Sequence, residues 1–304
     1  MLIPLRNYSN YSICESNIKI QDLVDFAIDK DLTAIALTDY KLLSGVLEFS
    51  TKLQKKGIQP IIGIDIDFIN SMGNLCRLTL IAKNQDGYKN LCTLSTKINT
   101  ENNFTISIAN IDEYSNGNIL ILGGLYSYFY ELSINEKNLK EAKAEIKKLK
   151  NIFNNDIFFE YDYNLNNSLL NQISIDLKIL TFLSSFSFYK NDHDFKSMQI
   201  LHCVKNGEYL QNSSFKITNN YSLNYKEVIS DNKYSILKEN CQLIANKIQF
   251  LLEEKPISLP NFTSDLNNNE DKELIKQARS GLDLRLKKIF KGIQERIQED
   301  KHCA

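Results

Sequence analysis

Short apolar runs alternate along the chain with segments in which apolar residues recur every three or four positions. The first such segment, residues 20–30, predicts an amphipathic helix, and residues 33–37 follow as a continuous apolar run. A run of that length is typical of a strand buried on both faces. The same alternation predicts further strands at 60–65, 77–82, 118–122, 157–161 and 179–183, and further helices at 42–56, 136–153 and 169–175.

Alternation of doubly buried strands with helices predicts an α/β fold with a mainly parallel sheet. An open sheet and a barrel both fit this pattern. In α/β barrels the chemistry lies just after the carboxyl ends of the strands, so those positions are where functional side chains are sought.

The C-terminal part has a different pattern. Residues 264–270 are polar and rich in Asn, which predicts a linker. A long amphipathic helix is predicted beyond it, weakened by Gly281 and Gly292, and its apolar face needs a partner. The apolar stripe of this helix consists of Ile275, Ala278, Leu282, Leu286, Ile289, Ile293 and Ile297.

Composition narrows the function classes. The 304 residues include 36 basic and 37 acidic side chains, so no basic excess indicates a partner with a phosphate backbone. No apolar run approaches the roughly 20 residues of a membrane helix, and no signal-peptide pattern opens the chain. We therefore expect a cytoplasmic protein without a membrane partner. The six cysteines form no CxxC pair, which argues against a zinc knuckle, and there are only three histidines.

Several segments, in order and spacing, carry a family resemblance. Near the start these are Tyr8-Ser-Asn-Tyr-Ser12 with Glu15-Ser16, Ala36-Leu-Thr-Asp-Tyr40 and Lys56-Gly-Ile-Gln-Pro-Ile-Ile-Gly63. Later ones are Gly87-Tyr-Lys-Asn-Leu91, Asn240-Cys-Gln-Leu-Ile-Ala245, Leu259-Pro-Asn-Phe262 and the Ala278, Gly281, Leu282, Arg285 pattern. Together they resemble the N-terminal PHP (polymerase and histidinol phosphatase) domain of the bacterial replicative DNA polymerase III alpha subunit.

This resemblance implies a distorted seven-stranded β/α barrel followed by a C-terminal helical segment. Residues 1–262 are expected to form the PHP-like domain. Residues 263–304 are expected to form a linker and a helix at the start of the polymerase palm, with the chain ending before the palm itself. Whether the chain is a fragment, one piece of a split subunit or a truncated gene product is left open.

The departures from the family pattern fall on its metal ligands. Arg6 and Tyr8 stand where active PHP domains have a His-x-His pair, and Tyr40 stands where they have the histidine after Thr-Asp. A guanidinium is a fixed cation that cannot bind a metal ion, and a protonated phenol is a poor ligand. Phe188 and Met198 replace two later ligands of the family.

The carboxylates Asp39, Asp65 and perhaps Glu15 are retained, but none of the family's histidines is. A multinuclear hydrolytic site needs several neutral imidazoles, so we expect no metal, no cofactor and no catalytic residue here. His193 and His202 are expected on one helix, facing opposite ways.

Some retained residues admit two interpretations. Asp39 either binds a cation or caps the turn after its strand, pairing with Arg6 or with a backbone N–H. Tyr8, Tyr11 and Tyr40 either line a ligand pocket or fill the cavity that the metals would leave, and the second interpretation agrees with close packing.

The resemblance also sets the functional expectations. The full family protein is a DNA-directed DNA polymerase, a nucleotidyltransferase, but this chain lacks the palm aspartates and is predicted to be inactive alone. We expect a catalytically inactive scaffold among polymerase III holoenzyme subunits that supports the polymerase and docks the proofreading exonuclease subunit. DNA is expected to be contacted only through the polymerase domains. The alternatives are a residual metal-dependent phosphoesterase or exonuclease, and a decaying gene product.

Overall fold

The computed structural model describes residues 2–101, 104–127, 139–184, 186–213, 221–223, 232–254, 256–257 and 270–302, with side chains described as far as residue 293. The chain divides into two compact units, Met1–Glu254 and Lys255–Ala304. The domain boundary after residue 262 stays a prediction. None of the helices in the described ranges is both long and apolar enough to cross a membrane.

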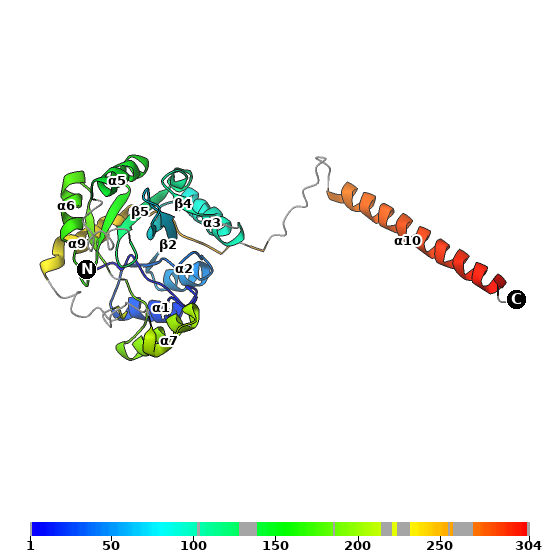
Figure 1. Ribbon diagram of the computed structural model, residues 1–304, viewed down its shortest axis with the longest axis horizontal. Helices are drawn as coiled ribbons and strands as arrows, with labels where there is room; N and C mark the ends of the chain where they lie inside the picture. The colour runs from blue at the N-terminus through cyan, green and yellow to red at the C-terminus, as the bar shows by residue number, and fades with distance from the viewer. Residues whose placement is uncertain are drawn as a thin grey trace. The chain divides into compact units, whose positions relative to one another are not determined.

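The first unit contains all the strands, with helices around them (Figure 1). Its α-helices are α1 (Ile20–Asp29), α2 (Val46–Gln54), α3 (Gln85–Thr100), α5 (Leu139–Phe153), α6 (Ser168–Leu177), α7 (Phe195–Asn206) and α9 (Ser235–Asn246). Its strands are β1 (Ala34–Leu37), β2 (Gln59–Ile69), β3 (Leu75–Ala82), β4 (Ile106–Ser107), β5 (Asn118–Gly123), β6 (Ile157–Tyr161) and β7 (Thr181–Leu183). Short 3₁₀ helices are η1 (Ile111–Tyr114), η3 (Asp192–Asp194), η4 (Leu210–Asn212) and η5 (Asn232–Tyr234).

The seven strands form one mixed sheet in the order β1-β2-β3-β5-β6-β7, with β4 beside β2, and they curl into a half-barrel (Figure 1). The N-terminal segment continues this curl on the outer side of β1. Ala36 N donates to Pro4 O at 2.8 Å, and Thr38 N donates to Asn7 O at 2.9 Å. The predicted α/β class and barrel form are confirmed.

The sheet is less parallel than the pattern predicted. β3 runs antiparallel to both β2 and β5, while β1–β2, β5–β6 and β6–β7 are parallel. The cause is a tight turn between β2 and β3, in which Gly73 adopts a φ of 81° and its N–H donates to Asn70 O at 2.9 Å. A hairpin of this kind needs no crossover helix, so the strand direction reverses.

Buried strand positions explain why the apolar runs were informative. All residues of β1 and β5 are buried, and α1 buries Leu23, Val24 and Ala27 against the core. α5 and α6 lie side by side on the outside, joined by a Lys143–Asp176 ion pair of 2.6 Å (Figure 1). The predicted elements coincide with observed ones wherever burial is continuous.

The pattern missed α3 because only three of its residues, Gly87, Leu91 and Leu94, are buried. Gly87 is required there, because a Cβ atom at this position would lie 2.0 Å from the carbonyl oxygen of Gly117. The helix predicted from residue 42 begins at Val46 instead. The helix predicted from residue 136 is described from Leu139, and residues 136–138 lie outside the described ranges.

The second unit contains α10 (Glu270–His302), which continues through both Gly281 and Gly292. Apolar side chains along it are exposed, among them Ile275, Ile289 and Ile293 at 52%, 56% and 48%. The predicted linker residues 264–269 and the side chain of Ile297 lie outside the described part of the chain.

Candidate functional site

The residues selected from the sequence meet just after the carboxyl end of β1, in the middle of β2 and beside the N-terminal segment. The centre of the group is Arg6, which is 2% exposed. Its Nη2 donates to Asp65 Oδ2 at 2.9 Å, and its Nη1 donates to Glu160 Oε2 at 2.5 Å. The guanidinium carbon lies 4.1 Å from the ring centroid of Phe186. A permanent cation therefore lies between two buried carboxylates.

The electrostatics keep Arg6 charged. Burial lowers the pKa of its guanidinium, but the negative charges of Glu160 and Asp65 outweigh burial and raise the pKa above its ordinary value. Glu160 also accepts a hydrogen bond from the hydroxyl of Ser184. Both carboxylates are thus satisfied by protein donors.

Asp65 has a complete set of partners. Besides Arg6, it accepts hydrogen bonds from the phenol of Tyr8 and from Thr79 Oγ1, the latter at 3.0 Å. Burial raises the pKa of Tyr8 well above its ordinary value, so the phenol stays protonated. A protonated Tyr8 is a hydrogen-bond donor to Asp65 and not a metal ligand.

A second arginine, which the sequence reasoning missed, lies beside Tyr8. Arg77 Nη1 donates to Tyr8 Oη at 3.2 Å, and Arg77 Nη2 donates to Glu15 Oε1 at 2.8 Å. Lys205 of α7 also donates to Glu15. Burial raises the pKa of Glu15, but its contacts with Arg77 and Lys205 outweigh burial and lower it. Glu15 is therefore an ionised link between β3 and α7.

Tyr40 lies over the second arginine. The guanidinium carbon of Arg77 is 3.8 Å from the centroid of the Tyr40 ring, a cation–π geometry. Tyr40 Oη donates to Asp67 Oδ2 at 2.8 Å, and Lys41 Nζ lies 2.5 Å from the same oxygen. Asp67, which the sequence reasoning also missed, fixes Tyr40 at the edge of the site.

Asp39 makes the hydrogen bonds that its structural interpretation predicts. It accepts hydrogen bonds from Ser9 N at 2.6 Å, from Ser9 Oγ at 2.7 Å and from Ser12 Oγ at 2.6 Å. The expected backbone N–H partner is confirmed as that of Ser9, whereas Arg6 pairs with Asp65 and Glu160. Burial raises the pKa of Asp39, although the hydrogen bonds from Ser12 and Ser9 lower it in part. Asp39 holds the turn over residues 9–12.

An aromatic cluster fills the space beside Arg6. Tyr8 and Phe188 meet edge to face with ring centroids 5.8 Å apart, and Phe186 and Phe188 are 4.4 Å apart. Met198 of α7 joins the same buried cluster. Tyr11 instead packs against the main core, so it does not share this position with Tyr8. The cluster favours filling over a ligand pocket.

Asp162 is a buried carboxylate at the margin of this cluster. Its Oδ2 accepts a hydrogen bond from Tyr221 Oη at 3.0 Å. Burial, followed by the negative charge of Glu160, raises the pKa of Asp162 to about 6. Sequence reasoning missed both Asp162 and Glu160, although a carboxylate inside an apolar strand signals a buried partner.

Neither described histidine belongs to this group. His193 lies in η3 and not on one helix with His202, because α7 begins only at Phe195. The His193 side chain is 79% exposed, and the His202 ring contacts Asn206 on its own helix. Across the described ranges, no three His, Cys, Asp or Glu side chains are grouped so that they could hold a metal ion.

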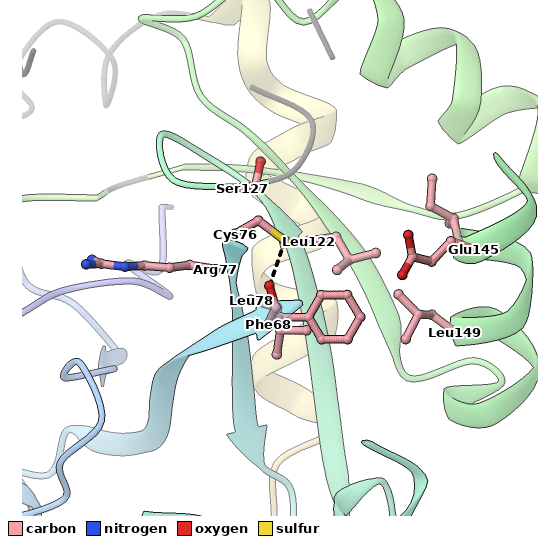
Figure 2. Close-up of a pocket in the computed structure, with 9 residues that line it drawn as sticks. Phe68, Cys76, Arg77, Leu78, Leu122, Ser127, Glu145 and Leu149 are labelled. Carbon is pink, nitrogen blue, oxygen red and sulfur yellow. Dashed lines mark hydrogen bonds between the residues drawn. The ribbon is translucent and has the colours of Figure 1, made fainter. Parts of the chain in front are cut away.

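A small apolar hollow of about 20 Å³ lies on the other side of β3. Figure 2 shows Cys76, Leu122 and Leu149 around it, with Arg77 pointing away. Cys76 Sγ donates to Phe68 O at 3.3 Å, the dashed line in Figure 2. The hollow has room for about one water molecule and none for a substrate.

Comparisons with known proteins agree with the resemblance. A family model described as "PHP domain" matches residues 4–164. DNA polymerase III subunit alpha of Buchnera aphidicola subsp. Acyrthosiphon pisum is 30% identical over 313 residues, covering 96% of this chain and 26% of the relative. The Rickettsia conorii protein of the same name is 28% identical, with 95% and 26% covered. The chain spans about a quarter of the length of these relatives.

A solved structure described as an amidohydrolase from Chromobacterium violaceum is also similar. It has 8% sequence identity and a TM-score of 0.45, and the match covers 66% of this chain and 97% of that one.

Proposed function

The chain belongs to the PHP domain family, and we propose that it is a non-catalytic member that acts in DNA replication as part of a DNA polymerase III alpha subunit. In this role it supports the polymerase and does not hydrolyse phosphodiesters itself. The relatives named DNA polymerase III subunit alpha support the replication role, because they align with nearly the whole chain.

The observation that carries the non-catalytic proposal is the position of Arg6. Its guanidinium lies 2.9 Å from the retained carboxylate Asp65 and 2.5 Å from a second buried carboxylate, Glu160. At an effective dielectric constant of about 20, a unit charge at about 4 Å opposes each charge of a metal ion by on the order of 4 kcal/mol. A divalent ion at this position would meet repulsion of several kcal/mol, enough to lose several powers of ten in affinity.

The partners of Asp65 and Glu15 support the same proposal. Metal binding at Asp65 would compete with the hydrogen bonds that it accepts from Arg6, Tyr8 and Thr79. Glu15 is taken up by Arg77 and Lys205. Such ionised pairs join β2, β3, α7 and the N-terminal segment, which is a structural function.

The direct test is elemental analysis of the purified protein, combined with hydrolysis of a chromogenic phosphodiester in the presence of Mn²⁺. We expect no stoichiometric transition metal and no hydrolysis above the buffer rate. Asp39→Ala is the matched variant for any activity that is seen. Near-stoichiometric metal, with hydrolysis abolished by Asp39→Ala, would establish the alternative of a residual phosphoesterase.

We further propose that the domain docks a proofreading exonuclease subunit from its own organism, a role that rests on the family alone. Co-elution of the two purified proteins at micromolar concentration is the expected result, with an exonuclease from an unrelated bacterium as the control. Absence of a complex would reject the docking proposal and leave the non-catalytic proposal standing.

A further inference from the structure

The segment after α9, residues 247–254, lies across the amino ends of the strands and is called the strap below. Its burial alternates: Ile248 and Phe250 are 5% and 6% exposed, whereas Leu251 between Phe250 and Leu252 is 48% exposed. A period of two in burial is the mark of an extended segment that rests on a surface. In the part of the chain that the structure describes, residues 248–254 nevertheless belong to no strand.

Side-chain donors, and not a β-ladder, hold the carbonyl groups of the strap. The carbonyl oxygen of Leu252 accepts from Ser50 Oγ at 2.9 Å and from Gln54 Nε2 at 2.8 Å, both on α2. The carbonyl oxygen of Ile248 accepts from Gln59 Nε2 at 3.1 Å. The barrel thus holds the strap through four neutral side-chain donors, the fourth being Thr51 Oγ1, which donates to Glu254 Oε1 at 3.5 Å.

The N-terminal half of the strap is held in addition by one backbone bond, by one ring contact and by the burial of Ile248 and Phe250 in the main hydrophobic core. Gln249 N donates to Lys83 O at 2.9 Å. The Phe250 ring stacks on Tyr88 of α3 with centroids 4.9 Å apart. A hollow of about 450 Å³ borders the strap along Gln54 and Gln59, so packing is incomplete on that side.

An ion-pair cluster marks the point where the strap begins. Asp156 accepts from Lys247 Nζ at 2.8 Å and from Lys83 Nζ at 2.5 Å. Burial raises the pKa of Asp156, but the hydrogen bonds from Lys247 and Lys83 outweigh it and lower the pKa. This cluster fixes the end of α9 to the barrel independently of the strap's later contacts.

We infer that the strap detaches from the folded barrel and returns to it, while Lys247 stays bound to the barrel. Opening breaks these contacts, withdraws Ile248 and Phe250 from the core and leaves the β2–β3 ladder intact, which is the pattern of local and not global unfolding. When the strap is closed, the chain after residue 254 leaves the barrel at α2. When it is open, the same chain is tethered at the end of α9 by up to roughly 25 Å more extended backbone. The inference is independent of the proposed function.

The test is hydrogen exchange of the full chain followed by mass spectrometry, comparing the wild type with the Ser50→Ala/Gln54→Ala variant. The variant removes both donors to Leu252 O. We expect exchange in the strap, which includes the Gln249 amide, to become about tenfold faster, as the loss of two neutral hydrogen bonds predicts. Exchange in β2–β3 should stay unchanged.

Gln242→Ala is the matched control, because Gln242 Nε2 makes one exposed hydrogen bond of 3.0 Å to Asn246 on α9 and none to the strap. If the double variant does not fold, Gln59→Ala decides, with an expected acceleration of severalfold in the strap alone. Unchanged strap exchange, or an equal acceleration in β2–β3, would overturn the inference.

Discussion

Replacing Arg6 by Met removes the central cation of the site while keeping a side chain of similar length. Asp65 and Glu160 are both fully buried, so neither can recover its lost partner from water. Removing one partner of a buried ion pair costs about 3–5 kcal/mol. Tyr8, Thr79 and Ser184 still donate to the two carboxylates, so we expect a value of about 3–4 kcal/mol. For a domain of this size, that lowers the unfolding midpoint by roughly 6–16 °C.

Urea denaturation followed by circular dichroism measures the free energy of unfolding, and calorimetry measures the midpoint. Arg279→Met is the matched control, because Arg279 is exposed on α10 and its loss should change the free energy by less than about 0.5 kcal/mol. The triple variant Arg6→Met/Asp65→Asn/Glu160→Gln should recover most of the loss, since no unpaired charge remains.

The pH dependence has a defined sign. Without Arg6, an unpaired negative charge stays buried in the folded state, and uptake of a proton neutralises it. The stability deficit of Arg6→Met should therefore be full at pH 8 and shrink as the pH falls toward 5. A deficit below about 1 kcal/mol at pH 8, or a triple variant no more stable than the single one, would refute the reasoning.

Three further predictions concern other parts of the chain. Because the folded-state pKa of Asp162 is about 6 and the ordinary value is 3.8, the free energy of unfolding should fall as the pH rises through this window. Asp162→Asn should flatten this pH dependence and raise the free energy of unfolding at pH 7.5 by at most about 3 kcal/mol, and an unchanged profile would contradict the assignment. Asp156 has a lowered pKa, so the control variant Asp156→Asn should instead reduce the free energy of unfolding. Amide exchange should be fast along α10, whose apolar residues are exposed, and slow in β2–β3; uniform protection of a monomer beyond Asp271 would contradict it. Primer extension with Mg²⁺ or Mn²⁺ should give no product from the isolated chain, and extension that survives rigorous removal of host polymerase would refute this.

The sequence predicted those elements whose burial leaves a continuous signature. β6 was predicted with its observed bounds and α1 to within one residue, because most of the residues that each buries in the core are apolar. The apolar pattern did not predict α3, because the outer face of this helix is polar and its contact with the core is narrow. The reversed direction of β3 depends on a five-residue turn whose geometry the apolar pattern does not encode.

For the candidate site, the sequence predicted several individual residues but not which side chains contact one another. Arg6, Tyr8 and Tyr40 were visible because each differs from a family ligand. Arg77 stands at no such position, and its contacts with Tyr8 and Glu15 span 69 and 62 residues of sequence. Glu160 carried a usable signal, since a carboxylate in the doubly buried run Ile157–Tyr161 requires a counter-charge, and Arg6 was the unassigned cation.

The ion pairs and hydrogen bonds also give the carboxylates of this site a structural role. Retention of Asp39 and Asp65 would indicate surviving metal chemistry only if the carboxylates had no other role. Asp65 instead stabilises Arg6, Tyr8 and Thr79, and Asp39 holds the turn at Ser9 and Ser12. Losing either acid would leave buried donors unsatisfied at a cost of about 1–3 kcal/mol each. Their contribution to the stability of the fold is thus a sufficient reason for both acids to be present, and their presence does not support the phosphoesterase alternative.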